Sequence, residues 1–473
     1  MSLSRNLLIV SFLVYSTLGC SKPEPAAESV PNELTDSTFS YQSSSPKGTD
    51  LAISRKQYTD KLYGFWLAQC IANWTGLITE MDKIGGEGKD GKAAGFYTRE
   101  NWGGPDHPNL WQIESLDEIS RNIDFVFKDE DEIWGADDDT DIEYIYQHIM
   151  WQTDNGKLTG EQIRNGWLTH IYSDENTPFK DDNGEPQNFL WVSNQSAHDL
   201  MLQGKVPPET SDPELNPNYE MIDAQLTTEI FGLFAPGRPD VALDIARLPI
   251  QTTARYEAQW IAEFYVIMHS LASVTDEEKS MKDQVFWLAQ QARKHLPDTS
   301  YSAKMYDFVK TQYDSEVPWE AARDALHEKY QVRQEDGYEW STKEEACNGC
   351  FAAGINFGAG MVSLFYGEGD IKETIKIGAL AGWDSDNPTA TWGGLLGFML
   401  GKAGVEQAFG RTFSNRFDIH RTRGGFDKPI DDFWKMSQKG VYVVDRVVQG
   451  QMNGNVLLEE DSWLIPNAIE MLE

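Results

Sequence analysis

The chain has 473 residues, enough for one large domain or two to three ordinary ones, and its 40% hydrophobic and 12% aromatic content can form a sizeable core, which excludes a disordered protein. Acidic residues number 75 against 40 basic ones, giving a formal net charge of −35. This charge argues against non-specific binding to nucleic acid, because such binding needs Lys and Arg to neutralise phosphates.

The first twenty residues form a predicted export signal. Arg5 precedes the apolar run LLIVSFLVYSTLG, which is too short to span a bilayer comfortably and ends in small residues before Cys20. The sequence TLGC is similar to a bacterial lipobox, although Thr17 stands where Leu is usual. We expect residues 1–20 to be a lipoprotein signal peptide, with Cys20 lipidated and the protein anchored in the bacterial cell envelope, periplasmic or outer-membrane. A plain signal peptide and an uncleaved anchor are the alternatives.

The next segment, residues 21–52, is rich in Ser and Pro and poor in large apolar residues. Such a composition buries too little surface to fold, so it predicts a flexible tether between the lipid and a folded domain. The single domain is expected to occupy residues 53–473.

Helical patterns dominate that domain. Between residues 56 and 74, apolar and aromatic side chains recur every three to four positions, as on a helix with one buried face. Similar patterns occupy 141–151, 255–271, 284–295 and 347–364. Alternating strand patterns are scarce, and the best is VYVVDRVV at 441–448. The prediction is therefore an all-α fold with long loops, which leave room for small accessory elements.

Two sets of residues leave alternatives open. Cys347 and Cys350 in CNGC could be a redox pair, a disulfide or small core residues of a helix, and we favour core residues because no βαβ pattern surrounds them. In the loop NWGGPDHPNLWQ, Trp102 and Trp111 could stack on a sugar or base. Trp102 is taken as a candidate substrate-binding residue, although loop tryptophans more often cap the core.

Acidic residues gather in front of two predicted helices. Asp137, Asp138 and Asp139 precede the helix at 141–151, and Asp384 and Asp386 precede the helix of TWGGLLGFML. Helix capping explains one Asp at such a place. Several adjacent carboxylates repel one another unless a cation lies between them. Hard cations such as Mg²⁺ or Ca²⁺ prefer oxygen ligands, and the absence of a His or Cys cluster argues against zinc.

Taken with Glu80 in NWTGLITE, these residues resemble the ADP-ribosylglycohydrolase family, whose fold is all-α with a two-Mg²⁺ centre between helix ends. The resemblance covers about residues 57–402. The family's motif G-D-x-x-G-x-x-x-E is represented by Ala72, Asn73, Gly76 and Glu80. Its T-D-D-T and G-G-D-x-D-T motifs are represented by Asp137, Asp138, Asp139 and Thr140 and by Gly382, Trp383, Asp384, Asp386 and Asn387. Residues 229–246 look like its Pro-containing middle helix pair.

The resemblance implies roles for these residues. Glu80 and Asp139 are the candidate catalytic residues, with Glu80 orienting or deprotonating water, and Asn73 and Trp383 join Trp102 as candidate substrate-binding residues. Two Mg²⁺ ions are expected, with Mn²⁺ or Ca²⁺ as alternatives. Their candidate ligands are Glu80, Asp137, Asp138, Asp139, Asp384, Asp386 and Asn387.

The sequence departs from the family pattern around the predicted metal site. Asn73 replaces an Asp, and Asp137 and Asn387 replace Thr residues. The stretches TTEIFGLF and TTARYEA lack the family's small-residue-Met-Arg and Thr-His sequences. The predicted metal ligands are retained while the surrounding substrate shell has changed.

The resemblance implies a hydrolase, a metal-dependent glycohydrolase that cleaves an N- or O-glycosidic bond of an ADP-ribosyl or related glycosyl substrate. Its partners would be a small glycoside or an ADP-ribosylated substrate, with no nucleic acid and with membrane contact only through the lipid. Because of the export signal, a glycoside scavenged at the envelope is an alternative substrate. An exported sugar- or nucleotide-binding lipoprotein without catalysis and a purely structural Ca²⁺ site are the other hypotheses.

The segment after residue 402 lies largely outside the matching motifs. Its sequence HRTRGG contains Arg421 and Arg423, which could bind a phosphate or carboxylate of a ligand. A surface loop that pairs with this acidic protein is the interpretation we favour.

Overall fold

The helices predicted from the sequence are present in the computed structural model, which describes residues 35–42, 50–111, 119–181, 183–340, 347 and 349–466. Among the described helices, none is both long enough and apolar enough to cross a bilayer. Their bounds are α1 Arg55–Gly76, α2 Asp138–Trp151, α3 Gly160–His170, α4 Val192–Leu202, α5 Asp223–Thr227, α6 Ile230–Phe234, α7 Pro239–Ile250, α8 Tyr256–Ala272, α9 Met281–Arg293, α10 Tyr301–Asp314, α11 Trp319–Leu326, α13 Ala353–Gly367, α14 Ile371–Ala381, α15 Asp386–Phe409 and α16 Phe433–Gly450.

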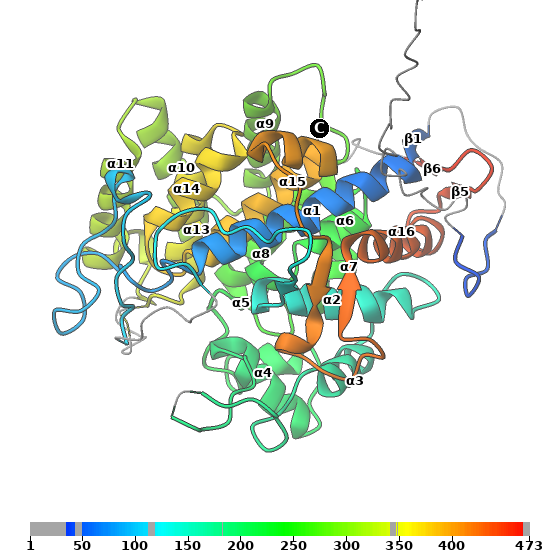
Figure 1. Cartoon of the computed structure of the whole chain (residues 1–473), viewed down its shortest axis with the longest axis horizontal. Helices are drawn as coiled ribbons and strands as arrows, with labels where there is room; N and C mark the ends of the chain where they lie inside the picture. Colours follow the sequence, from blue (N-terminus) through cyan, green and yellow to red (C-terminus); the bar gives the residue numbers. More distant parts are fainter. Residues whose placement is uncertain are drawn as a thin grey trace, which may run out of the picture.

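Helices α1 and α15 lie side by side in the middle of the molecule (Figure 1). Small residues let their backbones approach closely. A methyl group added at Gly64 would lie 2.2 Å from the carbonyl oxygen of Gly397, and one added at Gly397 would lie 2.3 Å from the carbonyl oxygen of Gly64. Only glycine fits at these two positions. This contact brings the end of α1 beside the start of α15, where predicted metal ligands are found.

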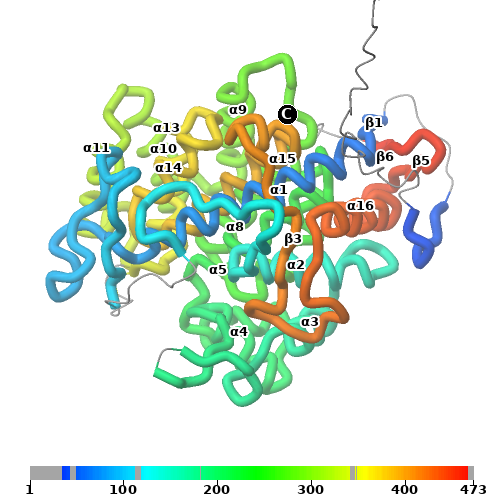
Figure 2. Tube along the Cα trace, viewed as in Figure 1, coloured from blue at the N-terminus to red at the C-terminus, as the bar shows by residue number. Residues whose placement is uncertain are grey.

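Two small sheets accompany the helices. β1 (Leu51–Ser54), β6 (Ser462–Ile465) and β5 (Asn455–Leu457) form an antiparallel sheet in the order β1-β6-β5. β2 (Trp134–Gly135), β3 (Arg416–Asp418) and β4 (Ile430–Asp432) form the second. The strands are short, and the all-α class with long loops is confirmed. A long connection with few regular elements joins α1 to α2, and its described residues can be followed in Figure 2.

Two local predictions were wrong. The segment VYVVDRVV is not a strand but part of α16, where Val441, Val444 and Val448 are buried at helical spacing against the core. The sequence CNGC is not part of a helix either, because α13 begins only at Ala353. Cys347 and Cys350 are buried and form a disulfide. The valine-rich composition of VYVVDRVV suits a strand or a helix, and only contacts with neighbouring helices selected the helix there.

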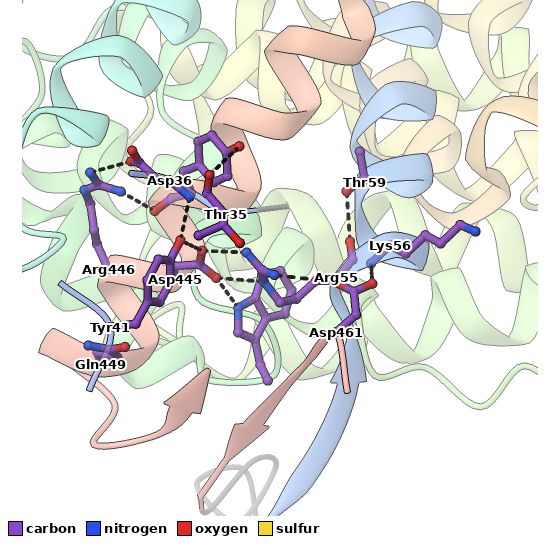
Figure 3. Close-up of polar contacts among 12 residues, drawn as sticks. Thr35, Asp36, Tyr41, Arg55, Lys56, Thr59, Asp445, Arg446, Gln449 and Asp461 are labelled. Atoms are coloured by element: carbon purple, nitrogen blue, oxygen red, sulfur yellow. Dashed lines mark hydrogen bonds and ion pairs between the residues drawn. The ribbon is translucent and has the colours of Figure 1, made fainter. Parts of the chain in front are cut away.

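The predicted tether is held against the domain along residues 35–42, which we call the N-terminal strap (Figure 3). Asp36 forms a buried ion pair with Arg446 of α16 at 2.8 Å and accepts a hydrogen bond from Trp151 Nε1 at 2.8 Å. The hydroxyl of Tyr41 donates to Asp445 at 2.9 Å. This part of residues 21–52 is therefore not a free linker, because its polar groups complete a buried network. The predicted signal peptide and Cys20 lie outside the described residues.

The same network ties the strap to the first helix (Figure 3). Asp445 accepts from Arg55 through Nε at 3.0 Å and through Nη2 at 2.8 Å, and also from Trp463 Nε1 at 2.7 Å. Asp445 and Arg55 are almost completely buried. The two charged pairs and the Tyr41 hydroxyl therefore join the strap, the start of α1 and α16, and the indole N–H of Trp463 adds β6.

The strap predicts a measurable effect on stability. Replacing Asp36 with Ala leaves the guanidinium of Arg446, only 4% exposed, without its carboxylate. We expect the free energy of unfolding to fall by about 3–5 kcal/mol, the usual effect of breaking a buried pair, as measured by chemical denaturation. Asp298→Ala is the control, because Asp298 is 90% exposed in its pair with Arg293 and its removal should change little. Equal effects of the two substitutions would show that the strap contributes no buried ion pair.

Candidate metal centre

The first acidic group lies at the N-terminus of α2. Asp137 is the residue before the helix, and its backbone N–H donates to Thr140 Oγ1 at 3.2 Å. Asp138 and Asp139 occupy the first turn, where the positive end of the helix dipole favours carboxylates. Asp139 is buried, whereas Asp137 and Asp138 are half-buried. The helix end therefore aims three carboxylates into one region.

The second acidic group lies in the turn between α14 and α15. Gly382 has a φ of 99°, and a methyl group there would lie 2.7 Å from the carbonyl oxygen of Lys83, so the turn requires glycine. The backbone N–H of Trp383 donates to that carbonyl at 2.8 Å, and the N–H of Met81 donates to the carbonyl of Trp383 at 2.9 Å. These bonds fasten the segment that carries Glu80 beside Asp384.

The structure brings the acidic residues at the start of α2, those of the α14–α15 turn and Glu80 together. Their side chains form two overlapping carboxylate groups. Within each group, one carboxylate oxygen per residue lies within 4.8 Å of the others. Asp386 belongs to both. The groups are Asp137, Asp138, Asp139 and Asp386, and Glu80, Asp384 and Asp386. An arrangement of this kind can hold cations, because carboxylate oxygens are the ligands that hard divalent ions prefer.

The electrostatics of the cluster reflect this crowding. Burial, followed by the negative charge of neighbouring carboxylates, raises the pKa of Glu80, Asp138, Asp139 and Asp384 well above the usual range. Burial also raises the pKa of Asp137, but only to about 6, because the positive charge of Arg421 opposes it. The cluster therefore needs protons or cations to be stable.

Two amide side chains, Asn73 and Asn387, contact the carboxylates, and a third, Gln225, contacts Asn387. Asn73 Nδ2 donates to Asp139 Oδ2 at 2.6 Å, Asn387 Nδ2 lies 3.4 Å from Asp139 Oδ1, and Gln225 Nε2 donates to Asn387 Oδ1 at 3.0 Å. Asn73 is fully buried, so in this structure it supports Asp139 rather than facing solvent as a substrate-binding residue would. Its Oδ1 has no hydrogen-bond partner among the described residues, which leaves that oxygen available to a cation.

The predicted aromatic residues have aromatic neighbours. The ring of Trp383 is fully buried beside Phe96, and Trp102 packs edge-on against Phe125 with ring centroids 4.8 Å apart. The role of both rings in substrate binding stays a prediction, as does the core-capping alternative for Trp102. Trp111 differs, because it is 46% exposed and follows Leu110, whose N–H donates to Met81 beside Glu80.

The two arginines of HRTRGG are not part of a loosely paired surface loop. Arg423 is fully buried and forms an ion pair with Asp141 of α2 at 2.8 Å. Arg421 lies over the ring of Trp74, donates to the carbonyl of Ala136 at 2.8 Å and approaches Asp137 to 3.8 Å. The loop therefore fixes the start of α2 and adds a positive charge near the cluster. The only sequence signal for this structural role of Arg421 and Arg423 was their positive charge, which also suited a solvated loop.

A comparison with protein families identifies the family of this chain. Residues 54–434 match the ADP-ribosylglycohydrolase family. A solved structure described as an ADP-ribosylglycohydrolase-related protein complex shares 12% sequence identity, with 83% of this chain and 99% of that chain covered and a TM-score of 0.46. No curated protein matched. All candidate ligands lie inside the matched range, although their individual roles stay predictions.

The crowded carboxylates predict stabilisation by divalent cations. An ion that binds the folded chain at 100 times its dissociation constant should stabilise it by about 2.7 kcal/mol, so Mg²⁺ added after chelator treatment should raise the Tm. Asp386→Asn removes the carboxylate that both groups share. This variant should lose the Mg²⁺-dependent rise and, because repulsion is relieved, should melt higher than the wild type in chelator.

Thermal unfolding followed by circular dichroism measures both effects. Asp244→Asn is the matched control, since Asp244 pairs with Lys157 at the surface and should leave the Mg²⁺ response intact. An equal rise in Tm for Asp386→Asn and the wild type would place the binding site elsewhere.

Proposed function

The chain belongs to the ADP-ribosylglycohydrolase family, and from this premise we propose that it is a metal-dependent hydrolase of an ADP-ribosyl or related glycosyl substrate. The observation that carries the proposal is the pair of carboxylate groups sharing Asp386 at the ends of α1, α2 and α15. Helix capping does not require two such groups to converge. Two adjacent cations with a common ligand account for them.

The proposed cofactor is a pair of Mg²⁺ ions, with Mn²⁺ or Ca²⁺ as alternatives. The residues that would hold them are Asp137, Asp138, Asp139, Asp384 and Asp386, together with Glu80 and the side-chain oxygen of Asn387. When bound, such ions position substrate hydroxyls and lower the pKa of water. The oxygen-only donor set fits Mg²⁺ better than zinc.

Glu80 is the proposed base. It is half-buried and lies on the segment held beside Asp384. Its carboxylate can accept a proton from a water molecule and direct that water towards the anomeric carbon. Asp139 is held by Asn73 at 2.6 Å and stays inside the cluster as a proposed ligand. Cleavage of the glycosidic bond develops positive charge on the sugar, which the surrounding carboxylates stabilise.

The location of the protein is also a proposal. The signal peptide and Cys20 would place the domain on a lipid anchor in the cell envelope, and the strap would begin 15 residues after Cys20. ADP-ribosylated proteins are chiefly intracellular, so a glycoside or nucleoside-like compound scavenged at the envelope is a second substrate class. The altered stretches TTEIFGLF and TTARYEA favour a changed substrate.

A binding protein without turnover is the alternative function. It is favoured by Asn73, which stands where the family has an Asp and which cannot act as an acid or base. The convergence of the carboxylates into two groups favours catalysis. Under this alternative, a sugar or nucleotide would bind in the presence of Mg²⁺ and remain unchanged.

A substrate panel separates these possibilities. The full-length protein is incubated with ADP-ribosyl-arginine, ADP-ribosyl-serine and simple glycosides, with Mg²⁺ or with chelator, and the released sugar is measured by chromatography. We expect release only with Mg²⁺. Glu80→Gln should lower kcat by about 10²–10⁴, the usual contribution of a general base. Asp244→Asn should have no effect.

The outcomes distinguish three readings of the site. Hydrolysis of plain glycosides but not of ADP-ribosyl compounds identifies a scavenging enzyme. Ligand binding by calorimetry with no release from any substrate supports the binding protein. Release that is equal in chelator and Mg²⁺ contradicts metal dependence.

A further inference from the structure

A second polar layer lies beneath the carboxylate cluster, four residues away along each contributing segment. Residues four apart on a helix lie above one another, one turn apart. The upper layer consists of Asn73, Asp139, Gln225 and Asn387, of which Asp139 and Asn387 are candidate metal ligands. The lower layer consists of Gln69, Glu143, Glu229 and Thr391. Three of the pairs each lie within one helix, α1, α2 or α15, whereas Gln225 lies in α5 and Glu229 directly precedes α6. None of the eight residues is more than 2% exposed.

The lower layer has its own hydrogen bonds. Gln69 Nε2 donates to Glu143 Oε2 at 2.7 Å, and the N–H of Ile230 donates to Glu143 Oε1 at 3.0 Å. Thr391 Oγ1 donates to Glu229 Oε1 at 3.0 Å. Gln69 Nε2 also lies 3.3 Å from the backbone carbonyl of Asp139, so the two layers are joined.

The charges of the lower layer are unusual. Within the described part of the chain, neither Glu143 nor Glu229 takes part in an ion pair, and Glu229 Oε2 has no hydrogen-bond partner. Burial raises the pKa of Glu229 to about 8, and burial together with the charge of Glu229 raises the pKa of Glu143 well above its usual range. Two buried carboxylates without a cation keep a proton. A protonated Glu229 can act as a hydrogen-bond donor from Oε2.

We propose that Glu143 and Glu229 are positioning residues of the metal centre. Their hydrogen bonds hold α2 and the α5–α6 segment in register with α1 and α15. That register sets Asp139 against Asn73 and Asn387 one turn above. The proposal rests on the proposed metal-dependent function. The lower layer acts through hydrogen bonding and not through negative charge, because no positively charged side chain among the described residues pairs with either glutamate.

Glu229 is the better residue to change. Both oxygens of Glu143 accept hydrogen bonds, so an amide there would oppose one donor. In Glu229→Gln, the amide oxygen can accept from Thr391 while Nε2 replaces the protonated oxygen as donor. In Glu229→Met, a side chain of similar length provides neither group. The two variants therefore separate hydrogen bonding from volume.

The experiment is a calorimetric titration of Mg²⁺ into the full-length, metal-stripped protein, at a temperature where circular dichroism shows each variant folded. Removing a group that orients metal ligands typically weakens metal binding about 10–100-fold. We expect this loss for Glu229→Met, and an unchanged Kd for Glu229→Gln. Thr391→Val, which removes the donor to Glu229, should weaken binding in the same direction and replaces Glu229→Met if that variant does not fold.

The results separate the two proposals. A wild type that binds no Mg²⁺ overturns the metal-dependent function, and the positioning role with it. A wild type that binds Mg²⁺, together with an unchanged Kd in folded Glu229→Met and in Thr391→Val, overturns the positioning role alone. Equal losses in Glu229→Gln and Glu229→Met would also overturn it, because they would show that the negative charge of Glu229 is what matters.

Discussion

Repulsion among six carboxylates is the constraint around which this fold is arranged. Their oxygens form two groups within 4.8 Å, and Asp386 is common to both. The N-termini of α2 and α15 and the guanidinium of Arg421 lower this repulsion, but helix dipoles are worth only about 0.3–1 kcal/mol each at exposed sites. Cations or protons must supply the rest. The close contact of α1 with α15 and the turn through Gly382 are the features that hold the groups together nonetheless.

The sequence predicted those parts of the structure that depend on local pattern. Helix spacing identified α1 and the Asp residues at the N-termini of α2 and α15, since capping and periodicity are properties of neighbouring residues. The sequence pattern failed where tertiary contacts decide. The valines of 441–448 suit a strand or a helix, and only their packing against the core selected the helix. The hydrogen bonds of Gln69, Glu143, Glu229 and Thr391 join four segments far apart in the chain, and no local pattern shows them.

The site combines the proposed metal ligands with surrounding residues that depart from the family pattern. An Asn at position 73 donates a hydrogen bond to Asp139, whereas an Asp there would add another negative charge to the cluster. The loop with Arg421 and Arg423 brings positively charged side chains to the edge of the carboxylate cluster. The strap joins Asp36 to Arg446 and Tyr41 to Asp445, so residues 35–42 are part of the folded unit.

Anomalous diffraction from crystals of the full-length protein soaked in Mn²⁺ tests the central claim most directly, because it locates the ions without assuming a substrate. We expect two peaks, one beside each carboxylate group, with Asp386 between them. No peak in this region, at a Mn²⁺ concentration that saturates binding in solution, would contradict it. Ions bound only at other acidic sites would do the same.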